Sequence, residues 1–97
     1  MNTKDIFSEV LCAVSNVTDI PRDIILSQSR REDIVDARHL LIHFLYTKGV
    51  YIVQISSITS ISMRHIAYIL SNFDGRVKTR RLLRMNYDII KTKLADN

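Results

Sequence analysis

The chain of 97 residues contains one cysteine, one proline, two glycines and no tryptophan. Its single cysteine, Cys12, cannot close an internal disulfide, which favours a reducing compartment. Gly49 and Gly75 are too far apart for the G-x-x-x-x-G-K-[ST] loop, and two glycines are too few for G-x-G-x-x-G, so no nucleotide cradle of either kind can form. The scarcity of glycine and proline also favours helices joined by short loops.

Long apolar runs are also missing. The longest, residues 40–46, is far shorter than the roughly 20 residues that a membrane-spanning helix needs. The first residues, Met1 to Asp5, lack the charged and then apolar pattern of a secretory leader. We therefore expect a cytoplasmic protein with no membrane partner.

Acidic residues are outnumbered in the second part of the chain. Residues 1–28 carry two basic and four acidic side chains, a net charge of −2. Residues 29–97 carry twelve basic and six acidic side chains, a net charge of +6, and the whole chain has a net charge of +4. This asymmetry predicts that any anion-binding surface lies in the second part.

Apolar residues at helical spacing predict an all-α domain over residues 1–97, with five to six helices. We expect Thr3 to cap the first helix, Ser62 to cap the fifth, and Asp74-Gly75 to separate the last two. Two short helices with a three-residue turn, near residues 51–71, have the spacing of a helix-turn-helix. The expected helices are 3–16, a short one after 19–21, 32–48, 51–58, 62–73 and 76–94.

If the fifth helix packs its apolar residues inward, Arg64, His65 and Tyr68 face outward near its N-terminus. Recognition helices read base edges with their N-terminal residues, and arginine on guanine is the commonest base-specific contact. The alternative is an ordinary solvated helix face.

The stretch SRREDIVDARH, residues 29–39, mixes basic and acidic side chains. Arg30 and Arg31 precede a helix whose N-terminal amides attract phosphate, and Arg38 and His39 follow one to two turns later. In the alternative interpretation, the three acids of the stretch favour the helix N-terminus, pair locally with an arginine and repel phosphate.

Five basic residues crowd residues 76–84, either as a solvated face or as a source of non-specific, salt-sensitive phosphate attraction. His39 and His43 are four residues apart on one helix, but no third ligand stands at a spacing typical of a metal site. No catalytic motif surrounds any serine, histidine or acid. We therefore expect no metal, no cofactor and no enzymatic activity.

Residues 20–39, IPRDIILSQSRREDIVDARH, resemble the C-terminal DNA-binding domain of the bacterial replication initiator DnaA. The resemblance covers about residues 6–94. It implies an all-helical, Trp-repressor-like fold with a helix-turn-helix, and double-stranded DNA as partner. In the resemblance, Arg30 matches the loop arginine that enters the minor groove, and Arg38 matches the arginine that opens the long helix and contacts DNA. We therefore expect Arg31 and Arg38 to hold phosphates. His39 stands where the family has glutamine.

The recognition-helix signature of that family, G-R-D-H-[TS]-T-V, corresponds to residues 60–66, SISMRHI. Ser62 replaces the aspartate, and Met63, Arg64 and His65 replace the base-reading residues. The resemblance therefore implies sequence-specific DNA binding at a site other than the initiator's own, without the ATPase module, in replication or transcription control. The alternative is a protein-interaction module on the same scaffold. The candidate DNA-binding residues are Arg30, Arg31, Arg38, His39, Ser62, Met63, Arg64, His65 and Tyr68.

Overall fold

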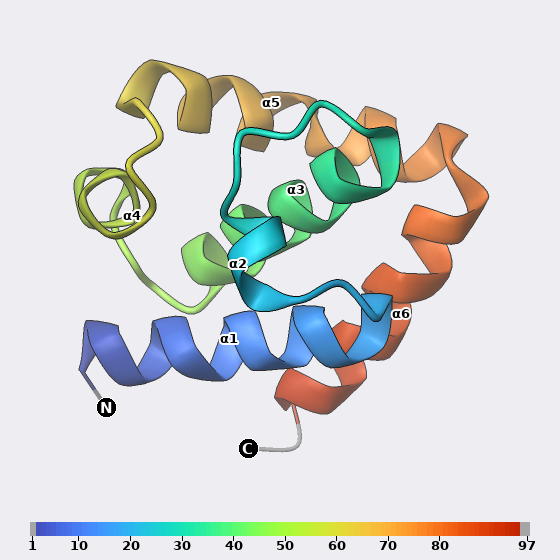
Figure 1. Cartoon of the computed structure of the whole chain (residues 1–97), viewed down its shortest axis with the longest axis horizontal. Helices are drawn as coiled ribbons and strands as arrows, with labels where there is room; N and C mark the ends of the chain where they lie inside the picture. The colour runs from blue at the N-terminus through green and yellow to red at the C-terminus, as the bar shows by residue number, and fades with distance from the viewer. Residues whose placement is uncertain (1, 96–97) are drawn as a thin grey trace.

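The computed structural model describes residues 2–95, and every regular element in that range is a helix (Figure 1). This confirms the all-α prediction. Within the same range, no helix combines the length and apolarity that crossing a bilayer requires. The helices are α1 (Thr3–Thr18), α2 (Arg22–Ile25), α3 (Glu32–Thr47), α4 (Ile52–Thr59), α5 (Met63–Thr79) and α6 (Arg81–Ala95).

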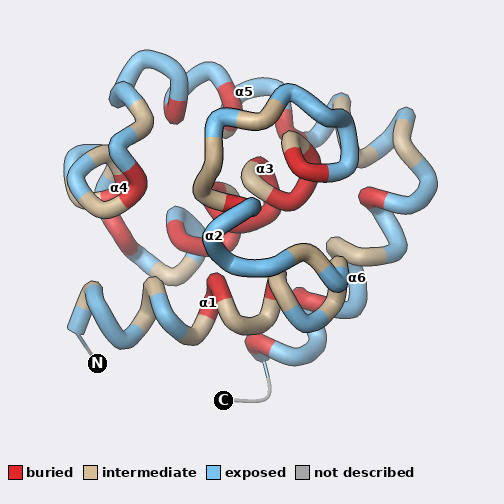
Figure 2. Tube along the Cα trace, viewed as in Figure 1, coloured by how far each residue is buried: buried red, intermediate tan, exposed pale blue. Residues whose placement is uncertain are grey.

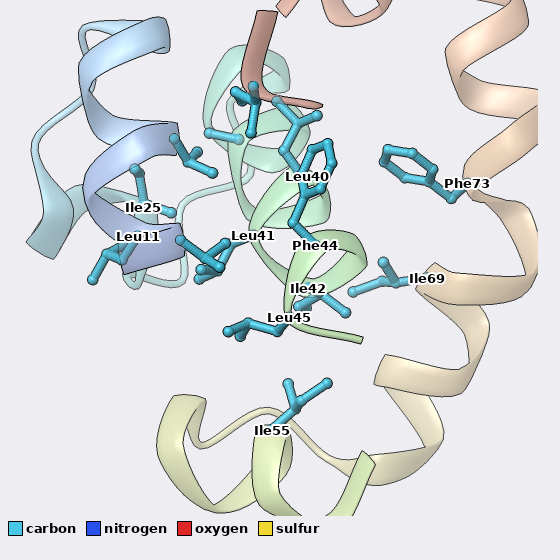
Figure 3. Close-up of a cluster of buried hydrophobic side chains, with 14 of the residues drawn as sticks. Leu11, Ile25, Leu40, Leu41, Ile42, Phe44, Leu45, Ile55, Ile69 and Phe73 are labelled. Atoms are coloured by element: carbon cyan, nitrogen blue, oxygen red, sulfur yellow. The ribbon is translucent and has the colours of Figure 1, made fainter. Parts of the chain in front are cut away.

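Helix α3 is the centre of the fold, and α1, α2, α4, α5 and α6 all contact it. Buried positions concentrate along it (Figure 2), because its residues from Leu40 to Leu45 are all apolar apart from His43. Leu40, Leu41 and Leu45 are fully buried. Figure 3 shows how side chains from α1, α4 and α5 converge on these leucines. One hydrophobic core therefore joins all six helices.

The first helix differs from its predicted bounds at both ends. Asn2 caps it, with the side-chain Oδ1 accepting from the amide of Asp5 at 2.9 Å, so Thr3 is the first helical residue and not the cap. Its C-terminus lies at Thr18 and not at residues 15–16. Asp19, at a φ of 60°, stops it there in the left-handed region.

The predicted pair of helices near residues 51–71 is present. Helix α4 ends at Thr59, residues 60–62 connect it to α5, and the two helices pack against each other. Ser60 turns the chain at a φ of 63°. The Ser62 hydroxyl accepts from the amide of His65 at 3.1 Å, which confirms Ser62 as the cap of α5.

The predicted break at Asp74-Gly75 is wrong. Helix α5 continues through both residues, and α6 begins at Arg81 and not at residue 76. Glycine inside a helix costs only about 1 kcal/mol, which the burial of neighbouring Phe73 can offset. The chain turns instead at Arg80, whose extended backbone has a φ of −123°.

Candidate nucleic-acid interface

A groove of about 710 Å³ lies between the loop that follows α2 and the start of α5. In Figure 1 this loop crosses in front of α3 on its way toward α5. Residues 26–30 form one wall, and residues 59–62 with the first turns of α5 form the other. The floor belongs to α3. Segments far apart in the sequence thus share one concave surface.

Six of the nine candidate residues line this groove, and the other three lie beside it. The six are Arg30, Arg38, His39, Ser62, His65 and Tyr68. Arg31, Met63 and Arg64 are exposed and do not line it. Gln28 also lines it, although nothing in its sequence context singled it out. The structure therefore brings the predicted basic loop and the predicted recognition helix together.

Helix α5 presents its first two turns as the sequence predicts. Ile66 and Ile69 are fully buried, whereas Arg64 and His65 are exposed. Tyr68 is 60% exposed, and its ring centroid lies 6.2 Å from that of His65. The outward face of α5 therefore combines a cation with two rings that carry polar atoms.

Arg38 points into the protein toward the groove loop. Its Nε donates to the carbonyl of Ile25 at 3.1 Å, and its Nη2 donates to the carbonyls of Ser27 at 2.6 Å and Ser29 at 3.1 Å. Burial lowers the pKa of the guanidinium. Arg38 therefore fixes the path of the loop, a different role from the outward phosphate contact expected of it.

His39 lies in the floor of the groove and is only 7% exposed. Burial, together with the positive charge of Arg76, lowers its pKa to about 4. The side chain is therefore neutral at pH 7, and its buried Nδ1 has no hydrogen-bond partner in the described part of the chain. It cannot supply a cation to the groove.

The acids of the SRREDIVDARH stretch have distant partners. The Asp36 carboxylate accepts from Arg76 Nε at 2.9 Å and from Arg80 Nη2 at 2.7 Å, and Arg80 also pairs with Glu32. The hydrogen bond to Asp36 raises the pKa of Arg80. The local pairing expected within the stretch is present only between Arg31 and Asp33, at 3.5 Å on the surface.

The ion pairs that Arg76 and Arg80 form with Asp36 and Glu32 have two electrostatic consequences. The negative charges of Glu32 and Asp36 are balanced by two arginines that come from the end of α5 and the turn into α6. These pairs also leave Arg76 and Arg80 less available to attract phosphate than the other basic residues within 76–84. Repulsion of a phosphate at the groove is weaker than the sequence implied, since the pairs are compact and partly buried.

His43 is half-buried beside the core. Its ring stacks on Phe73, with centroids 4.0 Å apart, and burial lowers its pKa. Among residues 2–95, no group of three or more histidine, cysteine, aspartate or glutamate side chains is arranged to hold a metal ion.

The fold and the groove together define an all-helical protein with a basic loop beside the exposed start of a long helix. Comparison with protein-family models, with curated proteins and with solved structures found no match to this chain. The resemblance to the DnaA domain therefore rests on the residues quoted above.

Proposed function

We propose that this protein binds double-stranded DNA in the cytoplasm, without catalysis, through a helix-turn-helix of the Trp-repressor-like type formed by α4 and α5. The observation that carries the proposal is the shared groove, in which Arg30 of the loop faces His65 and Tyr68 of α5 across a concave surface. A duplex fits such a surface when a helix enters one groove of the DNA and a loop follows the neighbouring backbone.

In this proposal α5 is the recognition helix. Its N-terminal residues are exposed, and its C-terminal half is anchored through Phe73 in the core and Arg76 on Asp36. Arg64 reads guanine through the O6 and N7 atoms. Met63, His65 and Tyr68 contact neighbouring bases or phosphates.

The loop supplies the second contact. Arg30 is exposed and enters the minor groove in this proposal, and Arg31 holds a phosphate. Arg38 is a positioning residue here, because its donors are directed at loop carbonyls. His39 contributes to the floor and not to the charge.

A second candidate function, protein binding on the same surface, is favoured by one observation. Met63 and Tyr68 are 52% and 60% exposed on the outward face of α5. Large apolar and aromatic side chains are the residues enriched at protein interfaces. A partner helix or loop seated on α5 would cover both.

Selection from a random duplex library tests the proposal, and an enriched motif is the expected result. Arg64→Ala should weaken binding to that motif by about 1–3 kcal/mol and relax one position of it, while Arg84→Ala, on α6 away from the groove, should not relax the motif. Arg30→Ala should reduce binding selectively if the side chain reads the minor groove, and uniformly if it only holds phosphate.

Two results would favour the protein-binding alternative. One is the absence of any enriched motif. The other is the absence of duplex binding at micromolar protein and low salt, where even non-specific phosphate contacts give measurable affinity.

A further inference from the structure

Helix α6 carries a second surface that the groove does not use. Leu82, Met85 and Ile89 are 65%, 53% and 47% exposed. Their spacing puts them on one face, whereas the face toward the core carries Leu83 and Ile90, which are essentially fully buried. Three large apolar side chains in one exposed row are more than the isolated surface residues that need no explanation.

Two charged residues flank this row. Arg81 and Asp88 each stand one position before an apolar residue of the row, so they share one edge of it. Seven residues turn a helix to within about 20° of two full turns and advance it about 10 Å. Both side chains are exposed, and neither forms an ion pair in the described range 2–95, not even Asp88 with Arg84 one turn away.

We propose that this face of α6 binds a second copy of the chain, with the two α6 helices antiparallel across a two-fold axis near Met85. That arrangement sets Leu82 of each copy against Ile89 of the other. The same symmetry sets Arg81 against the other copy's Asp88, twice over, since a two-fold contact is reciprocal. In a parallel arrangement the two-fold axis would run along the helices, so the edge with Arg81 and Asp88 would meet the opposite edge of the partner's row and this pairing would be lost.

This charge pattern selects a second copy as the occupant. In the antiparallel arrangement the apolar row and its charged edge are complementary to the same row and edge of a second copy. An unrelated partner would give no reason for opposite charges at a spacing of seven residues. Three side chains bury less surface than the roughly 800 Å² per partner of a standard interface. The association is therefore weak, with a Kd on the order of 10⁻⁵ to 10⁻³ M.

The dimer leaves the proposed DNA site free. No residue of α6 lines the groove, and Figure 1 shows α6 on the opposite side of the molecule from the start of α5. The inference does not depend on DNA binding and is tested without DNA.

Sedimentation equilibrium over the range from about 10 µM to about 1 mM measures the association. Wild-type protein should dimerise in this range. Arg81→Glu and Asp88→Arg should each weaken dimerisation roughly tenfold, because each variant faces like charges in both edge contacts. An equimolar mixture of the two variants should recover the wild-type affinity, because both edge contacts of the mixed dimer join opposite charges.

Met85→Glu should abolish the dimer, and the matched control Val53→Glu, at a 59% exposed position on α4, should leave it unchanged. Circular dichroism checks that each variant is folded. A wild-type chain that stays monomeric up to 1 mM would overturn the proposal. So would a dimer that resists Met85→Glu, or a mixture of the two charge variants that gains nothing over either alone.

Discussion

Asp36 should be the most costly single polar side chain to lose in this fold. Its carboxylate is 13% exposed and joins α3 to Arg76 at the end of α5 and to Arg80 at the turn into α6. Asp36→Asn removes the negative charge at nearly constant volume. The variant leaves two guanidinium groups, 28% and 30% exposed, without their main counter-charge.

The expected loss follows from this intermediate burial. Breaking a fully buried ion pair costs about 3–5 kcal/mol, whereas an exposed pair contributes at most about 1 kcal/mol. For Asp36→Asn we expect a loss of about 2–3 kcal/mol in the free energy of unfolding. A domain of this size has a total stability of about 5–15 kcal/mol, so the effect is large.

Urea unfolding followed by circular dichroism measures the change. With a slope of about 1 kcal/mol/M for a small domain, the midpoint should fall by about 2–3 M. Asp33→Asn is the matched control: its carboxylate is 52% exposed and meets only Arg31 at 3.5 Å, so its loss should stay within about 0.5 kcal/mol. Equal effects of the two variants would refute the reasoning.

Three further predictions concern His39, Arg38 and the glycines. The unfolded chain binds a proton on His39 below its ordinary pKa of 6.5, whereas the folded protein does so only near its lowered pKa of about 4, so stability should fall by about 3 kcal/mol as the pH drops through this window. His39→Gln should flatten that part of the profile, and the same change at exposed His65 should not. Arg38→Lys should speed amide hydrogen exchange in residues 27–31 relative to wild type, because one ammonium group cannot reproduce the guanidinium hydrogen bonds to three carbonyls. Gly75→Ala should raise the free energy of unfolding by about 0.5–1 kcal/mol, since its Cβ meets nothing within 4 Å, whereas Gly49→Ala should lower it because Gly49 has a φ of +92°.

Much of the helical architecture could be predicted from the sequence, because local signals define it. The spacing of Ile66 and Ile69 predicted the buried face of α5, and Ser62 was correctly predicted as its cap. The wrong boundary at Asp74-Gly75 has the opposite origin. The helix-breaking preference of Asp74-Gly75 was outweighed by the packing of Phe73 and by the ion pair between Arg76 and Asp36. Neither contact can be seen in a short window of sequence.

Six of the residues that line the groove could be chosen from the sequence, but the geometry of the groove could not be predicted. Arg30 and His65 both line the groove, in agreement with the two segments chosen from the sequence. Arg38 was expected to point outward, and its inward direction depends on loop carbonyls 9 to 13 positions earlier. The partners of Asp36 lie 40 and 44 positions away. Spacing rules for a single helix cannot reach such distances.

The three carbonyls gathered on Arg38 determine the thermodynamic cost of using the loop. A free loop must give up backbone freedom when it docks on a partner, at about 1–2 kcal/mol for each residue that becomes fixed. Here that ordering has already occurred during folding, because a side chain of α3 holds the carbonyls of Ser27 and Ser29 in place. Any partner of the groove therefore meets a surface of fixed shape, and a poorly matching partner cannot rely on the loop to adapt to it.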